Sequence, residues 1–155
     1  MQHAIDSRER KLDAFFKRAK KQAADDEITS DMARLGAVLA CGYIERCVEV
    51  IILERLTKRA HARVLKFVKS HFKKGTNYDC EAICQLLERF ESGWADSFRS
   101  QISKNEQWAS SLSSLYVLRN SIAHGGDQNR GLAGVETLYE DCKVIVKALV
   151  EATRR

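Results

Sequence analysis

Residues 31–56 run DMARLGAVLACGYIERCVEVIILERL, and this stretch decides the fold. Its apolar residues fall on most sides of a helix with 3.6 residues per turn, instead of on one side only. They are Leu35, Val38, Leu39, Ile44, Val48, Ile51, Ile52 and Leu56. We therefore predict a central, mostly buried helix. Gly36, Ala40 and Gly42 are small enough to let a neighbouring helix approach it closely.

The rest of the chain has the apolar spacing of further helices and few of the residues that break them. Its 155 residues include no proline and only eight glycines, the two strongest interruptions of regular structure. Apolar stripes at helical spacing predict further helices over 4–24, 57–74, 79–93, 103–124 and 135–153. The sequence thus predicts an all-α fold, a single-domain bundle of five to six helices over residues 1–155. Its 45% apolar composition is enough for a core.

Polar residues and glycines predict where these helices begin and end. Thr29 or Ser30 would cap the start of the central helix, and Asp79 would open a later one. Ser103 with Glu106 has the spacing of a capping box. Glycines at 75, 93 and 125–126 would end helices. Five residues of the basic stretch are expected to face the core: Val64, Leu65, Phe67, Val68 and Phe72.

The five cysteines are predicted to be reduced thiols packed as small hydrophobic side chains in a cytoplasmic protein. Cys80 and Cys84 could share a helix face, but a zinc site would need two more ligands and no histidine lies near. We expect no metal and no cofactor. The first residues lack a signal-peptide pattern. The longest apolar run, 35–44, is about half of the roughly 20 residues that cross a bilayer, so no membrane partner is expected.

The formal net charge of +5 is concentrated in one segment. Residues 58–74 hold seven Lys or Arg and two His, without one acidic residue. Such a face attracts nucleic-acid phosphates and anionic membranes alike, and a charge run also fits a merely solvated helix face. The candidate contacts to an RNA backbone are Lys66, Lys69, Lys73 and Lys74.

The candidate catalytic residues lie in RNSIAH, residues 119–124, just before the one glycine-rich loop. That loop is no P-loop, because Leu132 and Ala133 stand where Lys and Ser or Thr are needed. At about 100° per residue, Arg119 and His124 lie about 140° apart, and Asn120 shares a face with His124. A histidine exchanges protons near neutral pH, and a guanidinium can neutralise charge on phosphorus, so the pair suits metal-free phosphodiester chemistry. The plainer alternative is that Arg119 pairs with an acid and His124 caps the helix.

At these residues the sequence resembles the HEPN superfamily, and more narrowly its RiboL-PSP-HEPN branch. Members are all-α domains with the signature R-x4–6-H, typically with a polar residue after the Arg, as in Arg119, Asn120 and His124. The segment GYIER at 42–46 is similar to the second core helix of the family, where an acidic residue often faces the motif. The resemblance therefore makes Glu45 the candidate partner of Arg119. It covers roughly residues 34–153.

The resemblance implies a metal-independent endoribonuclease that leaves a 2′,3′-cyclic phosphate and a 5′-OH. His124 would be the base toward a ribose 2′-OH, Arg119 would stabilise the phosphate, and Asn120 would position the phosphate or orient His124. Members usually dimerise so that two motifs form one composite site, and many act as toxins or in phage defence. Partners would thus be RNA, a second copy, and an antitoxin or regulatory protein.

One position departs from the family pattern. Members controlled by adenylylation carry Tyr two positions after the His, where this chain has Gly126, so that regulation is not expected. The alternative function is a non-catalytic helical module that binds RNA or protein through the basic face around residues 58–74.

Overall fold

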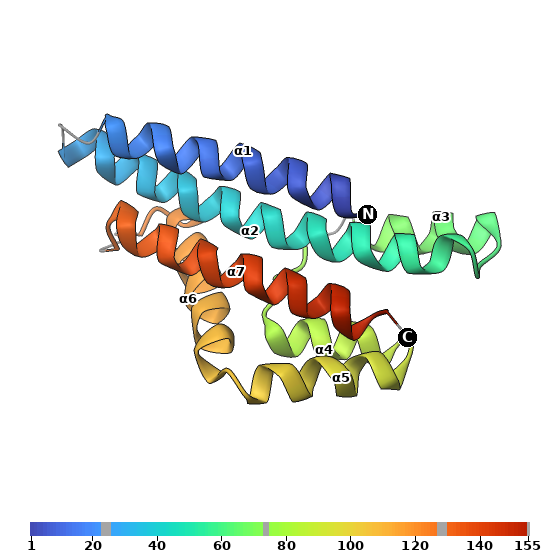
Figure 1. The fold of residues 1–155 in the computed structure, drawn as a ribbon. Helices are drawn as coiled ribbons and strands as arrows, with labels where there is room; N and C mark the ends of the chain where they lie inside the picture. Colours follow the sequence, from blue (N-terminus) through green and yellow to red (C-terminus); the bar gives the residue numbers. More distant parts are fainter. Residues whose placement is uncertain (23–25, 73–74, 127–129, 155) are drawn as a thin grey trace.

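The chain folds into α-helices joined by short connections (Figure 1). The computed structural model describes residues 1–22, 26–72, 75–126 and 130–154, and within these residues it has seven helices and no strand. The helices are α1 (Gln2–Lys21), α2 (Asp26–Thr57), α3 (Ala62–His71), α4 (Cys80–Glu88), α5 (Ser92–Ser103), α6 (Glu106–Ala123) and α7 (Leu132–Ala152). The all-α prediction is confirmed, with slightly more helices than the five to six expected. None of the described helices is long and apolar enough to cross a membrane.

Helix α2 is the centre of the fold, as its sequence predicts. Its 32 residues span about 48 Å at 1.5 Å per residue, and it packs against α1, α3, α6 and α7. In Figure 1, α1 runs antiparallel to α2, while α7 runs in the same direction as α2. A hydrogen bond from the Tyr43 hydroxyl to Glu9 Oε1, 2.7 Å long, joins α2 to α1. The Phe16 ring of α1 stacks on Tyr139 of α7, with centroids 5.3 Å apart.

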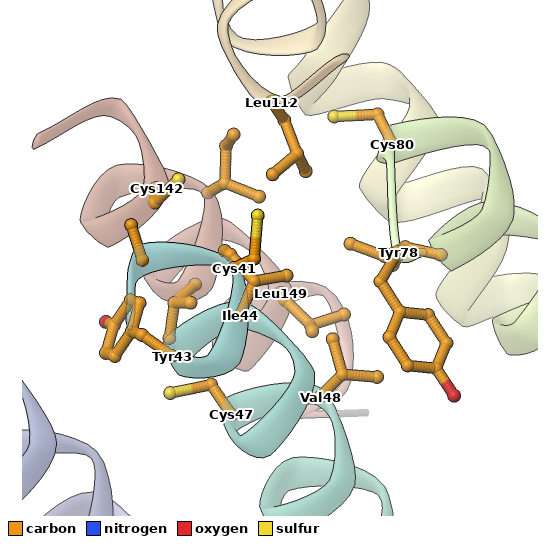
Figure 2. Close-up of a cluster of buried hydrophobic side chains, with 14 of the residues drawn as sticks. Cys41, Tyr43, Ile44, Cys47, Val48, Tyr78, Cys80, Leu112, Cys142 and Leu149 are labelled. Carbon is orange, nitrogen blue, oxygen red and sulfur yellow. The ribbon is translucent and has the colours of Figure 1, made fainter. Parts of the chain in front are cut away.

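The core contains all five cysteines. Figure 2 shows Cys41 and Ile44 of α2 near Leu112 of α6 and Leu149 of α7. The cysteines are buried and free: Cys41, Cys47, Cys80, Cys84 and Cys142. Burial raises the pKa of the Cys41, Cys47 and Cys80 thiols to about 12, so these side chains stay neutral. The prediction that they pack as small hydrophobic residues is confirmed.

Only one of the two glycines in α2 allows a close helix contact. A Cβ atom on Gly36 would come within 3.0 Å of the Phe16 ring, so α1 uses the missing side chain. A Cβ atom on Gly42 would meet nothing within 4 Å. The expectation is correct at Gly36 and wrong at Gly42.

Several predicted helix ends are wrong because the helical spacing does not predict α5, which lies between two of the expected helices. Gly93 lies in the first turn of α5 instead of ending a helix. The N–H groups of a first helical turn have no acceptor within the helix. Ser103 is the last residue of α5, and its hydroxyl bonds to the Ser100 carbonyl, so the capping box does not form. Asn105 is the N-cap of α6. At the start of α2, Thr29 and Ser30 lie inside the helix, which begins at Asp26.

The start of α4 is predicted correctly. The Asp79 carboxylate accepts a 2.8 Å hydrogen bond from the Ala82 backbone N–H, which is the N-cap geometry. The apolar spacing predicts that Ile83, Leu86, Leu87 and Phe90 face inward. Ile83, Leu86 and Leu87 are buried, and Phe90 is partly buried against the core.

Some apolar side chains expected in the core are exposed instead. On α3, Val64 is 50% exposed and Phe67 is 71% exposed, because this helix packs mainly against α2 and only one of its faces is covered. On α2, Leu35 and Val38 also face solvent. Helical spacing predicts that these apolar residues face the core, but packing against other helices decides which of them are buried.

Candidate active site

The last turn of α6 ends in a Schellman motif built on the two glycines. His124 is the C-cap, and its backbone N–H bonds to the carbonyls of Asn120 and Ser121. The Gly125 N–H bonds to Ile122 O at 3.2 Å, and the Gly126 N–H bonds to Ser121 O at 2.9 Å. Gly125 has a φ of +71°, a conformation that favours glycine. The backbone around His124 is therefore fixed by bonds that do not involve the histidine side chain.

Arg119 and Asn120 interact directly one turn before the helix end. Arg119 Nη1 donates a 3.1 Å hydrogen bond to Asn120 Oδ1, and both side chains are half-buried. This bond holds the guanidinium on the side of α6 that carries Asn120. His124 lies one turn further along, and its side chain is exposed.

Glu45 faces this pair from α2. Burial raises the pKa of the Glu45 carboxyl above its ordinary value of 4.5, and the positive charges of Arg119 and Arg46 offset that shift in part. Arg119 is thus close enough to act on the Glu45 charge. In the described part of the chain the two groups do not form an ion pair within 4 Å. Arg119 therefore keeps its charge available for a ligand, with a carboxyl group beside it.

Two further residues surround Glu45, and the motif did not indicate them. Cys41 lies one turn before Glu45 on α2, and its thiol points at the Leu115 carbonyl, 3.7 Å away. The charge of Glu45 raises the pKa of the Cys41 thiol, and the charge of Arg119 lowers it. Tyr78 lines the same hollow as Glu45. The spacing of four residues between Cys41 and Glu45 could have predicted the first neighbour, whereas no local signal indicates Tyr78.

The exposed face of α6 beside His124 carries no charge. Residues at 110, 113, 117, 121 and 124 recur at helical spacing, and they are serines, a valine and the histidine. Val117 is 67% exposed, which is unusual for a large apolar side chain. This uncharged α6 face lies on a chain in which 30% of the residues are charged.

The candidate RNA-contacting lysines are placed only in part. Lys66 and Lys69 are exposed on α3, and Lys69 also lines the hollow that contains Glu45. Lys73 and Lys74 lie outside the described residues. Among the described cations of residues 58–71, only Arg59 has an acidic partner, Glu91 at 4.0 Å. The positive charge of residues 58–71 is therefore largely unneutralised by the acidic residues that the structure describes.

Metal ligands do not gather at the site. Across residues 1–22, 26–72, 75–126 and 130–154, no group of three or more His, Cys, Asp or Glu side chains could hold a metal ion. The groups that could do chemistry here are an imidazole, a guanidinium, a carboxamide and a carboxyl.

Comparison with known families agrees with the motif and the fold. The profile of the RiboL-PSP-HEPN family matches residues 3–154. The chain belongs to the RiboL-PSP-HEPN family. HEPN domains are all-α and are often ribonucleases, and the motif of this RiboL-PSP-HEPN chain ends the helix that precedes α7. No curated protein and no solved structure matches the chain significantly.

Proposed function

We propose that this RiboL-PSP-HEPN protein is a metal-independent endoribonuclease. The observation that carries the proposal is the end of α6, where the exposed His124 follows the bonded pair Arg119 and Asn120. Glu45 lies near Arg119. An imidazole can transfer a proton near neutral pH, and a guanidinium can stabilise the charge on a phosphate during cleavage.

The reaction requires one proton to be removed and another to be supplied. In the proposed mechanism, His124 takes the proton from a ribose 2′-OH, and that oxygen attacks the adjacent phosphorus. The bond from phosphorus to the 5′-oxygen breaks, which leaves a 2′,3′-cyclic phosphate and, after protonation, a 5′-OH. Arg119 stabilises the charge on the non-bridging oxygens, and Asn120 holds Arg119 in place through their hydrogen bond.

The second proton needs a second acid, and we propose that a homodimer supplies it. Each copy would contribute one His124 to a composite site. The uncharged α6 face with its exposed Val117 suits contact between two copies, since charges are depleted at the centres of protein interfaces.

The first test is cleavage of single-stranded RNA in the presence of EDTA. We expect the wild-type protein to cut RNA and to leave cyclic-phosphate ends, detected by mass spectrometry of the products. His124→Ala should lower the rate by at least about a hundredfold, the usual contribution of general acid–base catalysis.

The control for this test is the fold of the variant. The α6 terminus is held by backbone bonds, so His124→Ala should keep the circular dichroism spectrum and unfolding midpoint of the wild type. Intact RNA after incubation with a verified wild-type dimer, across varied substrates, would contradict the proposal.

We also propose that this activity serves a toxin or phage-defence role, with an antitoxin or regulatory protein as the controlling partner. Expression tests it, since the wild type should inhibit growth while His124→Ala and Arg119→Ala should not.

The second candidate is a non-catalytic module that binds RNA or protein, and the unneutralised cations of α3 favour it. If wild type and His124→Ala are equally tolerated in cells and bind RNA equally without cutting it, this second function is the correct one.

A further inference from the structure

Helix α3 holds a phenylalanine ring in solvent beside an apolar hollow. Phe67 is 71% exposed, which the amphipathic pattern of the helix does not predict. The hollow has a volume of about 210 Å³. Phe67 and Phe72 form its wall on the α3 side, and Leu86 and Phe90 form its wall on the α4 side. We name it the phenylalanine hollow.

A histidine and an arginine also line this hollow. They are His71, the last residue of α3, and Arg89, the residue that follows α4. No acidic residue lines it in the described part of the chain, and Arg89 forms no ion pair there. The hollow therefore joins aromatic surface to an arginine that has no acidic partner among the described residues.

The phenylalanine hollow continues toward the candidate active site. A middle hollow of about 280 Å³ shares His71, Leu86 and Arg89 with it, and adds the polar side chains of Thr76 and Gln85. A third hollow, of about 380 Å³, shares Thr76 and Tyr78 with the middle one. Its wall includes Glu45, the carboxyl beside Arg119.

We propose that the phenylalanine hollow binds one unpaired nucleobase of a single-stranded RNA whose neighbouring phosphates contact His71 and Arg89. The inference rests on the proposed function in that the same strand would continue through the hollows toward Glu45 and Arg119. Aromatic side chains bind unpaired bases by stacking, with little preference for sequence, while adjacent cations bind the backbone.

The size and the charge of the hollow favour a nucleotide over a protein segment. A volume of about 210 Å³ lies below the roughly 300–1,000 Å³ of typical ligand pockets, so it suits a single ring system. A docked helix would need several apolar anchors along a groove. The surface beyond the hollow is instead polar. Arg89 of the middle hollow and Arg46 and Lys69 of the third can bind phosphates. Glu45 and Glu49 also line the third hollow.

The test uses a short single-stranded RNA that contains 2-aminopurine, whose fluorescence is quenched when it stacks. The protein carries His124→Ala so that the strand stays intact. We expect binding to quench the fluorescence, and Phe67→Ala to raise Kd about fivefold or more, the loss typical of one stacked base. Phe67→Leu should also weaken binding, because it keeps apolar volume and removes the aromatic face. Val64→Ala, at an exposed apolar residue of the same helix that lines none of the three hollows, should change nothing.

The phosphate contact is tested in the same assay. Arg89→Gln should weaken binding at every sequence and reduce the slope of log Kd against log salt by about one. Arg10→Gln is the matched control, since this exposed arginine of α1 lies outside the basic segment 58–74 and lines none of the three hollows.

Three results would overturn the inference. They are an unchanged Kd for Phe67→Ala, an equal effect of that change on a strand with abasic sites, and a larger effect on an acidic peptide than on RNA. The last would assign the hollow to a protein partner. Cleavage by the wild type is measured separately. Base-dependent quenching without cleavage would refute only the proposed ribonuclease, and cleavage with an unchanged Kd would refute only the nucleobase site.

Discussion

The surroundings of Glu45 shift the pKa of its carboxyl group in opposite directions. Burial raises its pKa above 4.5, and Arg119 and Arg46 lower it. Cys41 and Tyr116 lie close enough for the charge of Glu45 to raise their own pKa values. Since the net shift of Glu45 is upward, its ionised form costs folding free energy, which is unusual for a residue that serves only stability.

Replacing Glu45 by Gln should therefore change how stability depends on pH. Above about pH 4.5 the unfolded chain loses the Glu45 proton before the folded chain does, so this group lowers the free energy of unfolding as pH rises to its folded pKa. The advantage of Glu45→Gln over the wild type should be smallest at pH 4 and larger at pH 7. Urea unfolding at both pH values measures it, and a difference independent of pH would contradict the assignment.

The motif residues could be predicted from sequence because they are local. Arg119, Asn120 and His124 belong to one helix end, and helical geometry alone brings them near one another. The place of Tyr78 in the hollow of Glu45 could not, because Tyr78 comes from another segment, which meets α2 only in the folded chain. Site residues on one helix can therefore be predicted from their spacing, whereas site residues from different elements cannot.

At the scale of elements, α2 provides a matched pair of glycines. Gly42→Ala should raise the free energy of unfolding by about 0.5–1 kcal/mol, since Ala favours a helix and its Cβ meets nothing within 4 Å. Gly36→Ala should lower that free energy, because its Cβ would lie 3.0 Å from Phe16, which is buried and stacked on Tyr139.

Chemical denaturation of both variants checks this pair. If both substitutions stabilise the protein, α1 does not rest on Gly36 as described. If both destabilise it, the face of α2 at Gly42 is covered by something that the chain itself does not provide.

A helix can be predicted where its apolar spacing and its capping residues indicate the same bounds, and not where they indicate different ones. Asp79 caps α4 as expected. Helix α5 was missed because Gly93 was taken as a terminator, although a first-turn glycine costs a helix little. Phe67 was assigned to the core because its spacing is apolar, and the packing of α3 mainly on α2 leaves it exposed.

At the scale of the whole molecule, the proposed composite site makes activity depend on assembly. Val117→Glu and Val117→Arg should both give monomers in analytical ultracentrifugation, because each buries an unpaired charge at the proposed interface. Both should lower RNA cleavage at least about tenfold at concentrations where the wild type is a dimer.

The two opposite charges separate assembly from RNA binding, since only the Glu variant would repel phosphate. Val144→Glu, at an exposed valine of α7, should leave both properties unchanged. A fully active monomer would show that one copy suffices for cleavage.

The backbone hydrogen bonds that end α6 have a consequence for how mutations at position 124 are inherited. Because backbone hydrogen bonds join His124–Gly126 to the helix, we expect that codon 124 can change without loss of the fold. A single mutation could then convert an active gene into one that encodes an inert but well-folded copy. If copies assemble as proposed, such an allele would be dominant over the active one, since mixed pairs would lack one of the two imidazoles.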